Sequence, residues 1–168
     1  MTVQAVEQPG GVGRGANLKP LYLQSLTLVE RLHRRMLDLI KDEFDRAAIF
    51  NLSSVQALLL FNIGESELAA GDLRKRGYYL GSNVSYNLKK LTALGYVHNR
   101  PSPADRRSIS VSLTERGRAV ASIVDRLYER HVRWIDGSGA VDAADIRKIR
   151  RSLRRLDRFL TDQVLYRL

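Results

Sequence analysis

A helical segment followed at once by two short alternating segments constrains the fold most. Residues 82–94 carry one apolar stripe at spacings of four, three and three, which is the period of a helix face. Gly95 then provides a typical left-handed helix end. Residues 96–100 and 109–113 alternate like half-buried strands, and turn-forming residues join them. A helix running directly into a hairpin predicts a small α+β unit. The stripe consists of Val84, Leu88, Leu91 and Leu94.

The segments before this unit are predicted to be helical. A long helix is expected over 19–47, too long to serve only the core of a small domain. A second helix is expected over 54–63, with Asn51 or Ser53 as its N-cap. A short helix over 71–76 then leads by a tight connection to the helix that begins at residue 82.

Two more helices are predicted after the hairpin. Thr114 begins the first, and the segment 136–140 ends it. The last helix starts near residues 141–144 and repeats apolar residues at spacings of three and four, as a coiled-coil seam does. A helix with such a seam needs a partner surface, so we expect it to pack on a second copy of the chain. The seam consists of Ile146, Ile149, Leu153, Leu156 and Leu160.

These elements predict a mainly α fold with a small β-hairpin. Two short helices and a hairpin form a winged helix-turn-helix, which is flanked here by long dimerisation helices. The predicted division is a flexible arm over 1–18, a dimerisation helix over 19–50, the winged helix-turn-helix over 51–117 and dimerisation helices over 118–168.

The charge of the chain favours an anionic partner. Lys and Arg number 28 against 18 acidic residues, which gives a formal net charge of +10. Such a chain attracts polyanions, with nucleic acid the first candidate and an acidic membrane surface the second. The absence of cysteine excludes disulfides and thiol chemistry. With neither a membrane-length apolar run nor a secretory signal, we expect a cytoplasmic protein.

The outer face of the helix over 82–94 suits the DNA major groove. Asn83 could read an adenine edge through its amide, which both donates and accepts. The hydroxyl groups of this face could bond a base edge or a phosphate, whereas Lys89 and Lys90 are better placed as phosphate contacts. The alternative is an amphipathic helix with a solvated polar face. The hydroxyl-bearing residues are Ser82, Ser85 and Tyr86.

The hairpin strengthens the DNA-binding interpretation. Arg100, Arg106 and Arg107 bracket its turn, and an arginine on an extended tip can enter a narrow minor groove. Asp105 would repel phosphate, so its expected role is to shape the tip. The alternative is a solvated charged turn.

The same stretch resembles the MarR family of bacterial transcriptional regulators. The resemblance lies in Asn83 to Leu91, Gly95-Tyr96-Val97, Asp105-Arg106-Arg107 and Leu113-Thr114-Glu115-Arg116-Gly117. It implies a homodimer that binds double-stranded DNA, with each winged helix on half of an inverted repeat about one helical turn from the other. It also implies that Arg107 enters the minor groove. Many members of the family release DNA when a small aromatic or acidic effector binds between the dimer helices and the winged helix.

The remaining polar residues give no sign of catalysis. His33, His98 and His131 share no metal-ligand spacing, and the chain has no nucleophile–base pair or phosphate loop. We therefore predict no enzyme, no cofactor and no metal. His33 and His131 lie on the predicted dimer helices and could line an effector cleft.

The last helix carries a basic face whose role the sequence leaves open. It is expected to be solvated, with pairing from Asp145, Asp157 and the other subunit; DNA flanks, an acidic partner and a lipid surface are alternatives. Its members are Arg147, Lys148, Arg150, Arg151, Arg154, Arg155 and Arg158.

The predicted function is a sequence-specific transcriptional regulator. One alternative is an architectural protein that coats DNA with weak specificity, which would keep the salt dependence of binding and lose the preference for an operator. The other is a protein-interaction module that retains the fold and binds no DNA.

Overall fold

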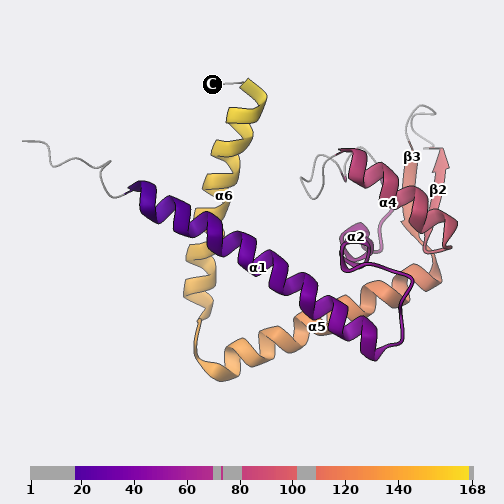
Figure 1. Cartoon of the computed structure of the whole chain (residues 1–168), viewed down its shortest axis with the longest axis horizontal. Helices are drawn as coiled ribbons and strands as arrows, with labels where there is room; N and C mark the ends of the chain where they lie inside the picture. The colour runs from indigo at the N-terminus through magenta and orange to yellow at the C-terminus, as the bar shows by residue number, and fades with distance from the viewer. Residues whose placement is uncertain (1–17, 70–72, 74–80, 102–108, 167–168) are drawn as a thin grey trace, which may run out of the picture.

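A computed structural model describes residues 18–69, 73, 81–101 and 109–166 of the chain (Figure 1). The fold is mainly helical with one small antiparallel sheet, as predicted. The predicted arm falls outside the described residues except for Leu18, which begins the first helix instead. The hairpin turn and, apart from Leu73, the short helix over 71–76 also fall outside the described residues. The elements are α1 (Leu18–Arg46), α2 (Ser54–Ile63), β1 (Leu68–Ala69), α4 (Gly81–Ala93), β2 (Val97–Pro101), β3 (Ile109–Leu113), α5 (Glu115–Ser138) and α6 (Ala143–Tyr166).

Local hydrogen bonds set the ends of the helices. Ser53, rather than Asn51, caps α2: its hydroxyl accepts from the Gln56 amide N–H at 3.3 Å, and its own N–H donates to the Gln56 side chain at 3.1 Å. Thr114 caps α5 as predicted, since its hydroxyl accepts from the Gly117 N–H at 3.0 Å. Gly95 follows α4 with a φ of +75°, the left-handed conformation that the sequence predicted.

The sheet contains one strand more than the predicted hairpin. β3 is central and pairs with both β2 and β1, in the order β1-β3-β2. Val111 and Leu113 are buried as predicted, but Ile109 is 46% exposed because it lies opposite Pro101 at the end of the β2–β3 pair that is farthest from the start of α5. Ser110 is buried instead, because neighbouring strands flank it on both sides.

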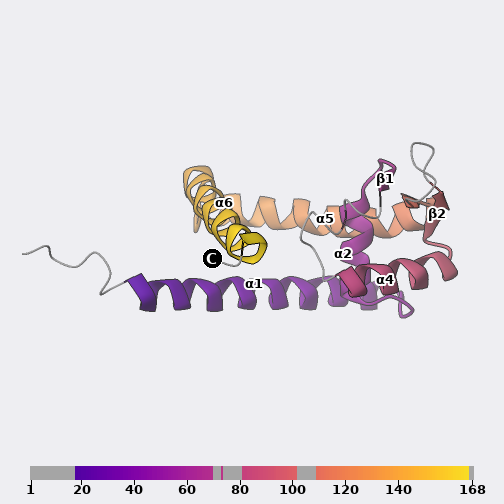
Figure 2. The same cartoon turned by 90° about the horizontal axis from the view of Figure 1, so that it is seen from above.

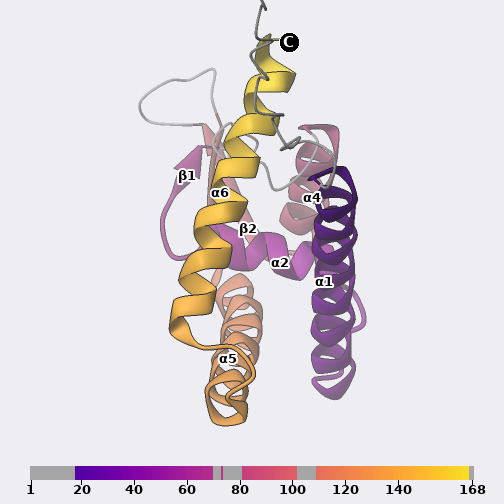
Figure 3. The ribbon, with the colours of Figure 1, turned by 90° about the vertical axis from the view of Figure 1, so that its left-hand side faces the viewer.

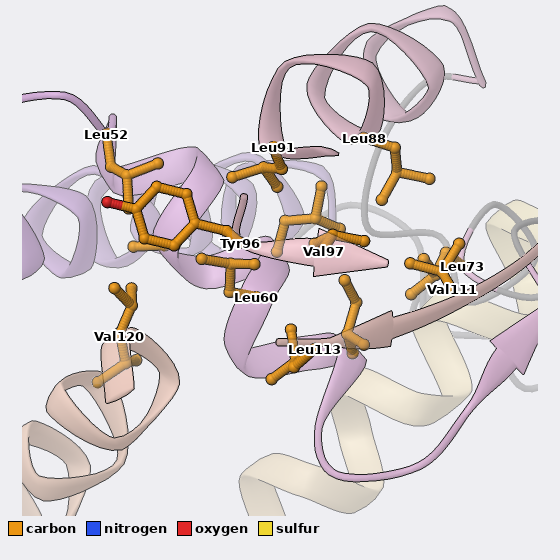
Figure 4. Close-up of a cluster of buried hydrophobic side chains, with 14 of the residues drawn as sticks. Leu52, Leu60, Leu73, Leu88, Leu91, Tyr96, Val97, Val111, Leu113 and Val120 are labelled. Atoms are coloured by element: carbon orange, nitrogen blue, oxygen red, sulfur yellow. The ribbon is translucent and has the colours of Figure 1, made fainter. Parts of the chain in front are cut away.

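The hydrophobic core lies between α2, α4, the sheet and the first half of α5. Figure 4 shows Leu60 of α2, Leu91 of α4, Val97 of β2 and Leu113 of β3 converging in one cluster. The end of α1 closes the core with Ile40 and Phe44. All described buried side chains lie between Ile40 and Leu127, so the winged-helix region has a core of its own.

The long helices extend well beyond this core. Figure 2 shows α1 and α5 running along two sides of the molecule, with α2, α4 and the sheet gathered at one end. α6 turns back from the far end of α5, and in Figure 1 it passes across the line of the first half of α1, while Figures 2 and 3 show the two helices apart. No described side chain of α6 is buried, and most of its seam is exposed to solvent.

Candidate nucleic-acid interface

Packing of α4 on the core turns its polar face outward. Val84, Leu88 and Leu91 are buried, as the apolar stripe predicted. On the other side Tyr86 is 67% exposed, and Ser85, Lys89 and Lys90 are exposed as well. Ser82 and Asn83 lie in the first turn of α4, and their side chains fall outside the described part of the structure.

A buried glutamine joins α4 to the start of α2. Gln56 is almost completely buried, and its side-chain N–H donates to the Asn87 side-chain oxygen at 3.1 Å. The same glutamine also completes the capping box with Ser53, so one side chain links the cap of α2 to the middle of α4. The helix period predicts Asn87 at the edge of the core. The linking role of Gln56 was not predicted, although the Ser-x-x-Gln spacing of a capping box was an available signal for it.

The base of the hairpin is fixed against the start of α5. The Thr114 hydroxyl donates to the Gly95 carbonyl at 2.8 Å, and the Thr114 N–H donates to the Tyr96 carbonyl at 3.1 Å. The guanidinium of Arg116 lies 4.4 Å from the centre of the Tyr96 ring and donates to the Leu94 carbonyl at 3.1 Å. These contacts join the end of α4, the start of β2 and the first turn of α5.

Gly117 allows the closest approach in this joint. A Cβ built on Gly117 would overlap the Tyr96 carbonyl oxygen, and it would lie only 3.2 Å from the carbonyl carbon. The Leu-Thr-x-x-Gly pattern therefore has a physical basis: the threonine caps α5 and bonds the hairpin, and the glycine makes room for the strand.

Of the three arginines predicted to contact DNA from the hairpin, Arg100 lies among the described residues. Arg100 is exposed on β2, opposite Ser110 of β3 and next to the turn. Arg106, Arg107 and Asp105 lie outside the described residues, so their predicted roles stay predictions. The structure thus brings together an exposed α4 face and an exposed strand end on one folded unit.

The two candidate effector histidines lie on different helices. His33 is exposed on α1, whereas His131 is half-buried on α5 with its ring 6.0 Å from that of Trp134. Neither lines the cleft of about 140 Å³ between α2, β3 and α5, where Phe61, Arg118, Ser122 and Asp125 lie. Within the described ranges, no group of three or more His, Asp or Glu residues could hold a metal ion. None of the described helices is long and apolar enough to cross a membrane.

Comparisons with known proteins agree with this geometry. A family profile described as a winged helix DNA-binding domain matches residues 52–117. The exopolysaccharide II synthesis transcriptional activator ExpG of Rhizobium meliloti (strain 1021) is 32% identical over 136 residues, which cover 81% of this chain and 70% of ExpG.

Solved structures show the same fold at lower identity. MarR from E. coli, in a mutant form complexed with operator DNA, has a TM-score of 0.64 at 17% identity over 84% of this chain and 99% of MarR. The transcriptional regulator SlyA has a TM-score of 0.69 at 15% identity over 85% of this chain and 98% of SlyA. BpsR from Bordetella bronchiseptica has a TM-score of 0.61 at 21% identity over 80% of this chain and 98% of BpsR.

An outward-facing α4 beside a three-stranded sheet, matched by the profile, defines a winged-helix DNA-binding protein. The relative at 32% identity is a transcriptional activator, so this winged-helix class is one of transcriptional regulators. The chain belongs to the MarR family of winged-helix transcriptional regulators.

Proposed function

We propose that this regulator acts as a homodimer that recognises an inverted-repeat operator. The observation that carries the proposal is the exposure of two apolar helix faces. Large apolar side chains are exposed along the first half of α1 and along the seam of α6, where no described residue covers them. They include Leu21, Leu28 and Leu32 on α1, and Ile146, Ile149, Leu153 and Leu160 on α6.

A second copy of the chain is the occupant that fits these faces. The exposed apolar faces lie on α1, the end of α5 and α6. In a twofold dimer both copies use the same surface, so each of these faces can pack against the partner's copy of the surface. Val132, Trp134 and Ile135 extend the exposed apolar surface onto the end of α5. The two winged helices would then lie on opposite sides of the axis, which is the arrangement that an inverted repeat requires.

The seam can be tested with one substitution and a matched control. Leu153→Glu places a charge in the seam, and we expect sedimentation equilibrium to show a monomer where the unaltered chain is a dimer. Arg151→Glu changes charge on the opposite face of α6 and should leave the dimer intact. A fully dimeric Leu153→Glu protein would refute the proposed interface.

Operator recognition is assigned to α4 and the hairpin. Binding-site selection from genomic fragments, at a stated salt concentration, should return one inverted repeat.

Tyr86→Ala should weaken the binding free energy for the operator by about 1–3 kcal/mol and reduce the preference over unrelated DNA. Lys89→Ala should weaken binding to all sequences alike and reduce the salt slope by about 1 for each lost phosphate contact. Arg107→Ala should weaken operator binding without unfolding the dimer.

These variants also separate the alternative functions. Equal binding to operator and unrelated DNA, with a steep salt slope, would instead indicate an architectural protein. No binding to any duplex in low salt would indicate an interaction module. Unchanged operator affinity in both Tyr86→Ala and Arg107→Ala would overturn the assigned contacts.

A small aromatic acid is the class of effector that the cleft between α2, β3 and α5 supports. Within a volume of about 140 Å³, Phe61 offers an apolar wall and Arg118 a cation, and the carboxylates of Glu65 and Asp125 also line the cleft. The acid group of the effector would therefore have to pair with Arg118. In the structural relative BpsR, DNA binding is regulated by 6-hydroxynicotinic acid, which belongs to this chemical class.

The cleft can be tested by effector titration. We expect 6-hydroxynicotinic acid or benzoate, added at millimolar concentration, to release labelled operator from the unaltered protein. Arg118→Met should abolish the response, and Arg126→Met, an exposed arginine on the same helix, should keep it. Release that is equal in both variants would exclude this cleft.

A further inference from the structure

We propose that the basic face of α6 is a second DNA-contacting surface, which binds phosphates without reading sequence. The basic face consists of Arg147, Lys148, Arg150, Arg151, Arg154, Arg155 and Arg158, all of them exposed. The inference rests on the DNA-binding function and on the proposed dimer.

The basic face and the apolar seam lie on opposite sides of α6. At 100° per residue, Arg151, Arg154 and Arg158 fall within an arc of about 60°, and Leu153 and Leu160 fall on the opposite side of the helix. If the dimer covers the seam, the basic face therefore stays in contact with solvent. The two copies would present two such faces, one on each side of the twofold axis.

The cations of this face are largely unneutralised. Among the described residues, the ion pair between Lys148 and Asp145, at 3.6 Å, is the one found on α6. The described ion pairs include none between α6 and another element, so among the described residues no carboxylate of α1 or α5 pairs with an arginine of the basic face. The pairing that the sequence predicted with Asp157 is not found among the described residues. Cations left in this state attract a polyanion.

The chemistry of the face favours DNA over a membrane. Six of its seven cations are arginine, whose planar guanidinium binds phosphate oxygens in a bidentate manner. A membrane-bound amphipathic helix instead buries its apolar face in the lipid, and here that face is assigned to the dimer. Figures 1 and 2 show α6 set apart from α4 and the β2–β3 hairpin along the long axis of the molecule, so a ligand that contacts both must be long. Duplex DNA, which the proposed function already assigns to α4, is a polyanion of this kind.

The test compares two triple variants of the full-length protein. Arg151, Arg154 and Arg158 are each replaced by Gln in the first variant, and Arg31, Arg34 and Arg35, which are exposed on α1, are replaced in the control. Both variants lose the same charge. Affinity for the selected operator and for unrelated DNA is measured over a range of salt concentrations, and sedimentation verifies the dimer.

We expect the α6 variant to bind both DNAs about tenfold more weakly at moderate salt, with the ratio between them unchanged, because phosphate contacts position without specifying. Its salt slope should fall by at least about 1.8, the value for one lost phosphate contact per protomer at about 0.9 each. The control variant should keep nearly all of the slope.

Other results would overturn the inference. An unchanged slope in a dimeric α6 variant excludes DNA as the occupant. Equal losses of slope in the two variants would show a general effect of net charge. Loss of binding to vesicles of phosphatidylserine, with DNA binding intact, would assign the face to a membrane. Failure of the unaltered protein to bind any operator would instead refute the proposed function.

Discussion

Gly117 offers the sharpest test of how the hairpin is held. In Gly117→Ala the new methyl group would overlap the Tyr96 carbonyl oxygen, which is backbone and cannot turn aside. Overpacking of this kind costs about 1–3 kcal/mol, and movement of the carbonyl would also weaken its hydrogen bond from Thr114 by about 1 kcal/mol. Because alanine favours the helix more than glycine does, the substitution also stabilises the folded state by up to about 1 kcal/mol. We expect a net loss of about 2 kcal/mol in the free energy of unfolding.

The same helix contains its own control. Gly137 also lies within α5, has no neighbouring atom within 4 Å of an added Cβ and is not among the residues with positive φ. Gly137→Ala should therefore stabilise the protein, by about 0.5–1 kcal/mol. Urea denaturation followed by circular dichroism, at one protein concentration, measures both variants. Because the two changes are chemically identical, equal midpoints would refute the close approach at Tyr96.

Three further perturbations test individual contacts. Gln56→Leu should lower the free energy of unfolding by about 1–3 kcal/mol, because it removes the hydrogen bond to Asn87 and one hydrogen bond of the α2 cap. A variant whose free energy of unfolding, measured by urea denaturation, equals that of the unaltered protein would contradict this. Glu43→Gln should cost about 1 kcal/mol, and less at high salt, because Glu43 pairs with Arg130 across α1 and α5 at 2.6 Å; a cost that does not depend on salt would argue against the ion pair. Burial raises the pKa of Tyr128 above the ordinary 10.0. The buried neutral phenol therefore contributes fully to the free energy of unfolding below pH 10, and this contribution is lost as the pH rises through the pKa of the folded state. Tyr128→Phe should remove part of the loss of stability at alkaline pH.

The parts of the fold that depend on local chemistry were predictable from the sequence. The bounds of α2 follow from a cap at Ser53 and a stop at Gly64, which act within a few residues. The end of α4 at Gly95 follows in the same way. The apolar stripe of α4 also predicted which of its residues are exposed, because a helix has one period wherever it packs.

The parts that depend on distant segments were not predictable. β1 is two residues long and becomes a strand because Leu68 pairs with Val111 across the sheet. The bond from Gln56 to Asn87 joins residues 31 positions apart, so neither residue signals it locally. The pattern around Gly117 was recognised as a family feature, but its cause is visible only once Tyr96 lies against α5.

The distribution of buried residues divides the protein into two parts that stabilise themselves differently. The core from Ile40 to Leu127 is completed within one chain, so the winged helix has its own source of stability. α6 has no described buried side chain, and helices in proteins gain most of their stability from packing of an apolar face. Folding of α6 should therefore be coupled to dimerisation and depend on protein concentration, while the winged helix stays folded. Diluting the protein would dissociate the dimer and unfold α6, so the basic face and the contact with the second half-site would be lost together. Operator affinity should then fall more steeply with dilution than it would for two protomers that stay fully folded.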